Sequence, residues 1–405
     1  MNMKQKTGSI RWIYLILGVA ALLFAGVIYA WSILKTPLAE EFRWSGSQLA
    51  LNFTLTMCFF CLGGFAGGLL SKRLGSAFCL SLAATLSGLG FFLASRLQGS
   101  VTMLYLSYGV LAGTGIGIAY NVIISTVNAW FPDKKGLCSG ALMMGFGASA
   151  LVVGKLAAAL IEGPGWRTAY LVVGLALAGV LLVTAMILRR PGPDAVLPEP
   201  AQKKTAGAES FAQTDYPTGK MVRRLSFWLA FFCIVCISAV GSTVISFAKD
   251  LTVSVGAKAA LATTLVGVLS ICNGLGRIVI GALFDRLGRK KTMLLANCLT
   301  ILAAGVTLIA VLTESLHLCV AGLCITGFSY GASPTISAAF TSAFYGNRYF
   351  PLNFSVMNFN LIGASFVATA ASGLLESTGG YVGPFVLLLI LAVLSLALDL
   401  CIKKP

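Results

Sequence analysis

The stretch GLLSKRLG, residues 68–75, recurs 213 positions later as GALFDRLG, residues 281–288. Arg11 and Arg224, each at the start of an apolar stretch, are separated by the same 213 positions. A shared offset in two places indicates that the second half of the chain repeats the first. Each copy joins two long apolar stretches through a short basic loop, which is the pattern of membrane-spanning helices and their connections.

The composition excludes a soluble globular protein. Of the 405 residues, 58% are hydrophobic and 10% are charged, whereas charged residues make up about 25% of a typical chain. Glycine supplies 45 residues, and small residues let membrane helices approach one another closely. We therefore expect a packed bundle of helices in a lipid bilayer.

Twelve apolar stretches are each close to the ~20 residues that a bilayer requires. They are residues 11–34, 47–70, 77–96, 102–128, 137–162, 168–188, 225–247, 260–284, 292–313, 317–343, 351–375 and 380–402. The first is long and has no small-residue cleavage pattern after it, so we interpret it as a retained helix and not as a signal peptide.

A stretch rich in Pro and Lys, residues 191–222, has no apolar period and is predicted to be a cytoplasmic linker. It divides the chain into an N-terminal bundle, residues 1–190, and a C-terminal bundle, residues 223–405. The sequence thus predicts an all-α membrane protein of two pseudo-symmetric six-helix bundles, related by an axis along the membrane normal.

The net charge of +16 raises the question of a nucleic-acid partner. Most of the 29 Lys and Arg residues, however, fall in alternate loops, on the side that holds both termini. The positive-inside rule makes that side cytoplasmic, and we expect a multi-pass protein of a bacterial inner membrane with no nucleic-acid partner.

The eleven cysteines fall within the apolar stretches or at their ends. Cys233 and Cys236 form a C-x-x-C on an apolar helix, with the single His317 far away in sequence. Packing explains this pattern better than a disulfide or a metal site, so we expect no metal and no cofactor.

Arg277 lies within the eighth apolar stretch. A buried arginine costs ~2.5–3.5 kcal/mol on insertion scales and cannot lose its proton. One explanation is a structural ion pair, but none of the 13 acidic residues lies mid-span, and Glu376 and Asp399 are toward helix ends. We therefore favour a transported anion as the partner. The planar guanidinium fork matches a carboxylate with two parallel hydrogen bonds.

Five further residues could contribute neutral polar groups to such a site. Asn273 lies one helical turn before Arg277 and can donate to the same ligand or orient the guanidinium. The others are Tyr29, Tyr120, Asn121 and Tyr330 on spans one, four and ten. Each of these four, taken alone, is more often a packing or helix-contact residue.

The stretch GALFDRLGRKK, residues 281–291, resembles the loop signature of the major facilitator superfamily. The resemblance implies gating roles for Asp285 and Arg286, and for Asp133 in the loop after span four. The first copy departs from the signature, because Lys72 stands where Asp285 does. This departure puts a gating role of the first loop in doubt.

A narrower resemblance rests on NAWFPDKKGLCSG, residues 128–140, which is similar to the loop between helices four and five in the oxalate/formate antiporter and bacterial monocarboxylate transporter group. The group's aromatic end of helix one and its arginine in helix eight correspond here to Tyr29–Trp31 and Arg277. Oxalate carriers of the group have a second cation, a lysine in helix eleven, and Met357 stands at or beside that place. A single central cation suits a monoanion.

The resemblance and the residues together predict a secondary transporter for a small monocarboxylate of the lactate or pyruvate type, working as a monomer and co-transporting a proton. Asp250 and Glu376 are the candidates for proton coupling. The alternative is an obligatory carboxylate exchanger of the oxalate/formate kind, because an empty site with one unpaired cation should reorient poorly. A drug exporter is disfavoured because no acidic residue lies mid-span, and an enzyme because no nucleophile–base pair or phosphate loop is found.

Overall fold

The computed structural model describes residues 3–131, 135–192, 215–346 and 349–403. Within these residues, twelve helical segments are long and apolar enough to cross a membrane. Their bounds are Ile10–Leu34, Gly46–Ser71, Gly75–Ser95, Val101–Ala129, Cys138–Glu162, Trp166–Ile187, Leu225–Ser254, Ala259–Phe284, Arg286–Leu312, Leu316–Tyr345, Leu352–Thr378 and Val382–Leu400. Each segment lies where the sequence predicts one, which confirms the all-helical membrane fold. The seventh is longer than predicted and extends to Ser254.

The helices of the first half include several short elements between the long ones. In chain order they are α1 (Met3–Ala25), η1 (Gly26–Ala30), α2 (Trp31–Leu34), α3 (Thr36–Phe42), α4 (Gly46–Arg73), α5 (Gly75–Ser95), α6 (Val101–Leu104), η2 (Tyr105–Ala112), α7 (Gly113–Ala129), α8 (Lys135–Gly147), α9 (Ser149–Glu162) and α10 (Trp166–Ile187).

The second half begins with a short helix inside the predicted linker. Its elements are α11 (Thr218–Met221), α12 (Leu225–Ser254), α13 (Ala259–Leu312), α14 (Leu316–Tyr345), α15 (Phe350–Met357), α16 (Asn360–Thr378) and α17 (Val382–Leu400). α13 contains the eighth and ninth spans, which meet at a turn where Gly288 has a φ of 73°.

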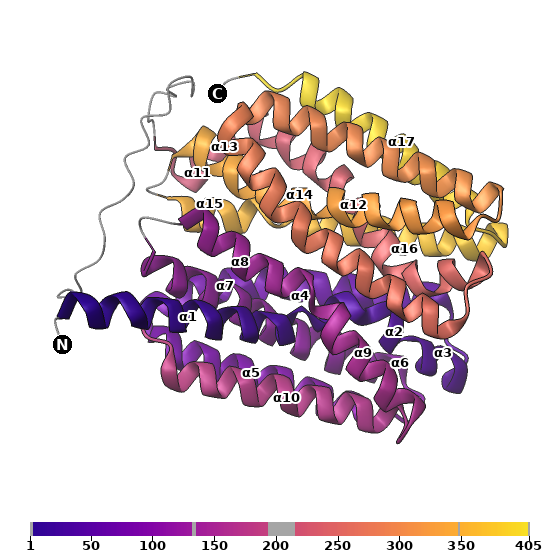
Figure 1. Cartoon of the computed structure of the whole chain (residues 1–405), viewed down its shortest axis with the longest axis horizontal. Helices are drawn as coiled ribbons and strands as arrows, with labels where there is room; N and C mark the ends of the chain where they lie inside the picture. Colours follow the sequence, from indigo (N-terminus) through magenta and orange to yellow (C-terminus); the bar gives the residue numbers. More distant parts are fainter. Residues whose placement is uncertain (1–2, 132–134, 193–214, 347–348, 404–405) are drawn as a thin grey trace.

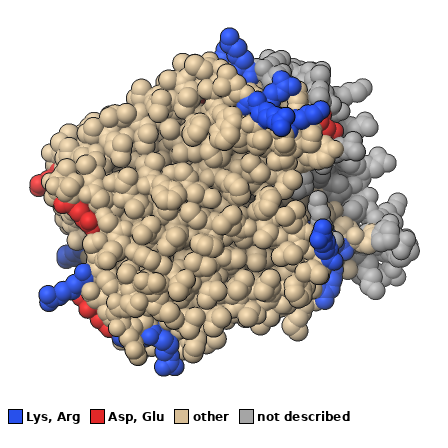
Figure 2. All heavy atoms as spheres, turned by 180° about the vertical axis from the view of Figure 1, so that it is seen from behind, with Lys and Arg blue, Asp and Glu red and all other residues tan. Residues whose placement is uncertain are grey.

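The two halves form two bundles that lie against each other, and both termini are at one end of the molecule (Figure 1). We call this the termini end and the opposite one the far end. Charged side chains gather toward the two ends of the face drawn in Figure 2, with an uncharged belt between them. Such a belt suits the hydrocarbon core of a bilayer, because a charged side chain there is costly.

The backbone repeats as the sequence does. Gly75 and Gly288, 213 positions apart in the two copies of the repeated loop, both have positive φ, of 81° and 73°. Glycine adopts this left-handed conformation without the clash that a Cβ causes. A close helix crossing at a glycine also occurs in both halves. Where α7 crosses α4, a Cβ added to Gly117 would lie 2.0 Å from the Phe60 carbonyl oxygen. Where α14 crosses α13, a Cβ added to Gly331 would lie 2.2 Å from the Asn273 carbonyl oxygen.

Among the described residues, four spans are interrupted. The first contains a 3-10 stretch, η1, and the fourth contains a π-helical stretch, η2. The fifth breaks at Ala148 between α8 and α9, and the eleventh breaks at residues 358–359 between α15 and α16. π-Helical turns are rare and often mark functional sites. The interruption in the first span lies at Tyr29, one of the residues predicted to line the transport site.

Candidate functional site

Arg277 extends from α13 in the second bundle into the first bundle. Its side chain is 2% exposed. Nη1 donates to the Met143 carbonyl oxygen of α8 at 2.8 Å, and Nη2 donates to the Tyr29 hydroxyl of η1 at 3.0 Å. The guanidinium therefore lies at the interface between the two bundles, where a central transport site would be.

No carboxylate in the described part of the chain forms an ion pair with Arg277. The ion pairs seen there do not involve this residue. Its remaining bond runs from Nε to the Asn273 Oδ1 at 3.3 Å, so all three acceptors are neutral. A guanidinium has five N–H donors, and two of them are left for a further acceptor. Of the basic residues whose exposure the structure describes, only Arg277 is buried.

Asn273 supplies a second unused donor. Its side chain is fully buried, its Oδ1 accepts from Arg277, and its Nδ2 has no hydrogen-bond partner among the described residues. An unpaired buried donor costs ~1–3 kcal/mol. A ligand oxygen beside the guanidinium would relieve this cost.

Aromatic rings surround the polar groups. The Tyr29 ring packs edge-on against Phe146 and Tyr330, with centroid separations of 5.3 and 5.9 Å. Tyr120 packs against Phe146 and Phe60 at 4.9 and 5.2 Å. The structure thus brings three of the predicted tyrosines together, from spans one, four and ten.

The guanidinium carbon of Arg277 lies 5.8 Å from the centroid of the Tyr29 ring. Phe60, Phe146 and the Met143 carbonyl were not predicted as site residues. Phe146 lies in a Gly-Phe-Gly stretch, residues 145–147. Every residue has a backbone carbonyl, so the sequence does not indicate that the carbonyl of Met143 accepts a hydrogen bond from Arg277.

Asn121 takes a different position. Its side chain lies beside Gly68 of α4, where an added Cβ would be 3.5 Å from Oδ1. Among the described residues, it makes no hydrogen bond to Arg277. The structure therefore separates Asn121 from the other predicted site residues.

The two coupling candidates lie at the far end and already have partners. Asp250 Oδ2 is 2.8 Å from the Lys35 Nζ. Glu376 accepts from the Ser47 backbone N at 2.7 Å and from its Oγ at 2.8 Å. Neither carboxylate is within ion-pair distance of Arg277 in the described structure.

Both contacts join one bundle to the other. Glu376 of α16 caps the N-terminus of α4, next to the capping box that Ser45 and Gln48 form there. A carboxylate at a helix N-terminus is stabilised by the helix dipole. Thr54 of α4 adds a third link, donating to the Ser365 carbonyl oxygen at 2.6 Å. These contacts join the two bundles at the far end.

Of the three predicted gating residues, Arg286 is the one whose side chain the structure describes, and it lies at the termini end. Asp133 lies outside the described residues, as does the side chain of Asp285. Arg286 is exposed, and Arg289, three residues later, lies 3.9 Å from Asp399.

The sequence of this chain is similar to those of known membrane transporters. The model of the Major Facilitator Superfamily matches residues 15–361 and 230–403. The oxalate:formate antiporter of Oxalobacter formigenes is 27% identical over 354 residues, which cover 86% of this chain and 82% of that protein. Monocarboxylate transporter 12 of Rattus norvegicus is 25% identical over 374 residues, 87% of this chain and 76% of that one.

Among solved structures, the xylose transporter XylE from E. coli, in a partially occluded inward-open conformation, superimposes with a TM-score of 0.70. The sequence identity is 13%, and 96% of this chain and 97% of that chain are covered. At this identity the likeness establishes a shared fold.

Proposed function

This chain belongs to the major facilitator superfamily and is a membrane transporter, and we propose that it carries a small monocarboxylate of the lactate or pyruvate type by alternating access. The observation that supports this most directly is Arg277, a buried cation between the two bundles with no resident carboxylate in the described structure. A transported anion would supply the missing charge.

The donors around Arg277 favour a carboxylate. Two N–H groups of the guanidinium and the Nδ2 of Asn273 are available. A carboxylate can accept from the fork with both oxygens, and a neighbouring oxo or hydroxyl oxygen can accept from Asn273. A 2-oxo or 2-hydroxy monocarboxylate fits this set. The names of the oxalate:formate antiporter and monocarboxylate transporter 12 agree with an organic anion as substrate.

The single buried cation favours a monoanion. Met357, which aligns with the second cation of oxalate carriers in the family resemblance, is fully buried. A dianion would bring a second charge into the site without a partner, and an unpaired buried charge costs several kcal/mol.

Alternating access requires the bonds across the interface to change. Arg277 contacts the first bundle through Tyr29 and Met143, so a substrate carboxylate would compete with these acceptors when the bundles reorient. We place the termini end in the cytoplasm, on the positive-inside rule. The closed far end is then the outer one.

Proton coupling would run through the carboxylates that close this outer end. Protonation of Glu376 removes the charge that accepts from Ser47, and protonation of Asp250 releases Lys35. Either event would weaken the contact between the bundles, which makes opening sensitive to protons from outside.

The alternative is a carboxylate exchanger, and Arg277 also favours it. With the site empty, the carrier would have to reorient around an unpaired buried cation, which is costly. The binding site of such a carrier would return to the opposite side of the membrane only with an anion bound, which is the behaviour of an exchanger.

One experiment separates these proposals. Purified protein in liposomes would be supplied with radiolabelled lactate or pyruvate, with and without an inward acid gradient, and challenged with unlabelled oxalate. We expect accumulation driven by the gradient and weak competition by oxalate at neutral pH. Stronger competition by oxalate than by unlabelled lactate would contradict the monoanion preference.

A further inference from the structure

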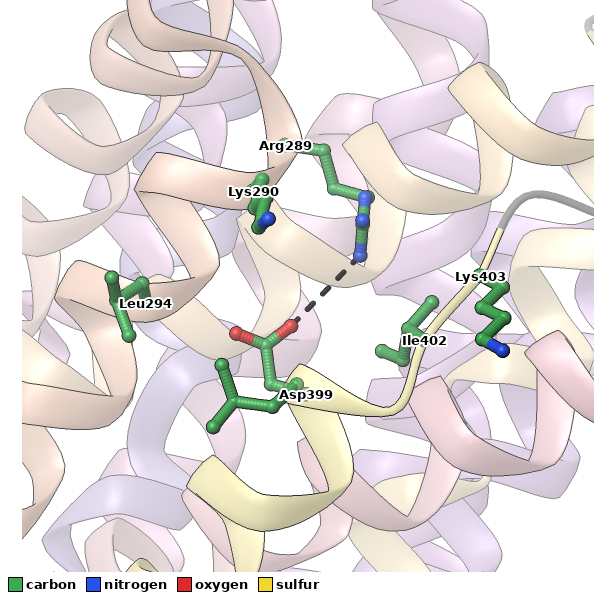
Figure 3. A pocket seen from close by; sticks show the side chains of 7 residues that line it. Arg289, Lys290, Leu294, Asp399, Ile402 and Lys403 are labelled. Carbon is green, nitrogen blue, oxygen red and sulfur yellow. Dashed lines mark ion pairs between the residues drawn. The ribbon is translucent and has the colours of Figure 1, made fainter.

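A second charged cavity lies at the termini end of the second bundle, apart from Arg277. Its volume is about 250 Å³, and its polar lining comes from Arg289, Lys290, Asp399 and Lys403. Figure 3 shows that Arg289 and Asp399 point toward each other from α13 and the end of α17. Three cations facing one carboxylate leave an excess of positive charge.

The Arg289–Asp399 pair leaves a donor unused. The Nη1 of Arg289 is 3.9 Å from the Asp399 Oδ1, which is beyond hydrogen-bond distance. That nitrogen is buried and has no hydrogen-bond partner among the described residues. Asp399 is held from its other side, because its Oδ2 accepts from the Asn297 Nδ2 at 3.3 Å. An additional acceptor would therefore find a free guanidinium N–H at this cavity.

The cavity lies at the boundary between the charged end and the uncharged belt. Arg289 is near the start of the span Arg286–Leu312, and Asp399 is near the end of the span Val382–Leu400. Two further lining residues, Leu294 and Leu400, are 41% and 66% exposed. Exposed leucines within spans face lipid, so cations stand directly beside a surface suited to acyl chains.

We propose that this cavity binds the phosphate group of an anionic phospholipid, with its acyl chain along Leu294 and Leu400. Basic pockets at the ends of membrane helices hold anionic headgroups in this way. A free phosphate would use the same cations and make no use of the exposed leucines. The lipid would join the loop at Gly288 to α17, at the end where the carrier has to open toward the termini side.

The test uses the full-length protein in detergent, with phosphatidylglycerol added as the probe. Native mass spectrometry would measure the lipid retained, with phosphatidylcholine as the neutral comparison. Arg289→Gln and Lys403→Gln should each lower phosphatidylglycerol retention about fivefold. The matched control is Lys291→Gln, which removes the same charge from an exposed position of the same helix that does not line the cavity.

A second variant separates lipid binding from misfolding. Asp399→Asn removes the one negative charge of the lining and can still accept from Asn297, so it should raise phosphatidylglycerol retention. Equal retention in Arg289→Gln, Lys403→Gln and Lys291→Gln, or lower retention in Asp399→Asn, would overturn the proposal. Displacement of the lipid by equimolar inorganic phosphate would overturn it too, and assign the cavity to a free anion.

Discussion

The Nη2 of Arg277 donates to the Tyr29 hydroxyl at 3.0 Å, across the interface between the two bundles. Tyr29 lies in the 3-10 interruption of the first span, and Arg277 lies on the eighth span. The bond therefore joins two residues that are 248 positions apart in the sequence. A rearrangement of the two bundles would change this bond, so the cation that we propose as the anion site lies at the interface between them.

Arg277 should not tolerate replacement by lysine. Arg277→Lys keeps the charge but cannot bond Met143, Tyr29 and a carboxylate together, because an ammonium is a point charge without the planar fork. A hydrogen bond to a charged group is worth ~1.5–3 kcal/mol, so uptake into proteoliposomes should fall at least about tenfold. The control is Lys155→Gln, an exposed lysine on α9. Uptake near the wild-type rate in Arg277→Lys would remove the central role of the guanidinium.

Asn273 should affect substrate affinity. Asn273→Ala removes the Nδ2 donor that has no partner in the described structure, and we expect KM for the anion to rise about tenfold or more. Asn121→Ala is the comparison, since that amide lies beside Gly68 and makes no bond to the guanidinium. We expect the Asn121 variant to change KM less. KM would be obtained from initial uptake rates at a series of substrate concentrations. A larger rise in KM for Asn121→Ala than for Asn273→Ala would contradict the role given to Asn273.

The sequence predicted the spans well because each needs only local information, namely about twenty apolar residues. Arg277 and Asn273 could also be paired from sequence, because residues four apart share a helix face. The interruption at Tyr29 was not predicted, since the residues around it are as apolar as those of an unbroken helix.

The partners of Asp250 and Glu376 could not be predicted either. Lys35 and Asp250 are 215 positions apart, and Ser47 and Glu376 are 329 positions apart. Such pairs form only when the two bundles dock, so they depend on tertiary structure. The sequence names both carboxylates as candidates for proton coupling, and the structure adds that both make contacts between the two bundles at the far end.

The close crossing of α13 and α14 should make Gly331 essential for stability. A Cβ there would lie 2.2 Å from the Asn273 carbonyl oxygen, which is backbone and cannot move aside alone. Gly331→Ala should therefore separate the helices and destabilise the fold by ~1–3 kcal/mol. The control is Gly305→Ala on α13, where no atom lies within 4 Å of the added Cβ. Thermal unfolding in detergent should show a lower midpoint for Gly331→Ala only, and equal midpoints would count against the crossing.

The last prediction concerns proton coupling through Glu376. Its carboxylate accepts two hydrogen bonds from Ser47 across the far end. Glu376→Gln imitates the protonated state, so under this proposal the far end should open without a proton. We expect uptake of labelled lactate or pyruvate to lose its dependence on an inward acid gradient, while exchange against internal substrate continues. Asp250→Asn should act in the same direction, although it leaves Lys35 without its partner.

Glu41→Gln is the matched control for this experiment. Glu41 is also a carboxylate at the far end, but its partners Arg167 and Trp166 belong to the same bundle. The hydrogen bond from Arg167 lowers the pKa of Glu41 below its ordinary value of 4.5, so it stays ionised at the pH of the assay and does not report protons. Its replacement should leave the gradient dependence intact. If the wild-type protein instead accumulates substrate without regard to the gradient and only against internal carboxylate, Glu376 holds the gate closed without coupling it to protons, and the carrier is an exchanger.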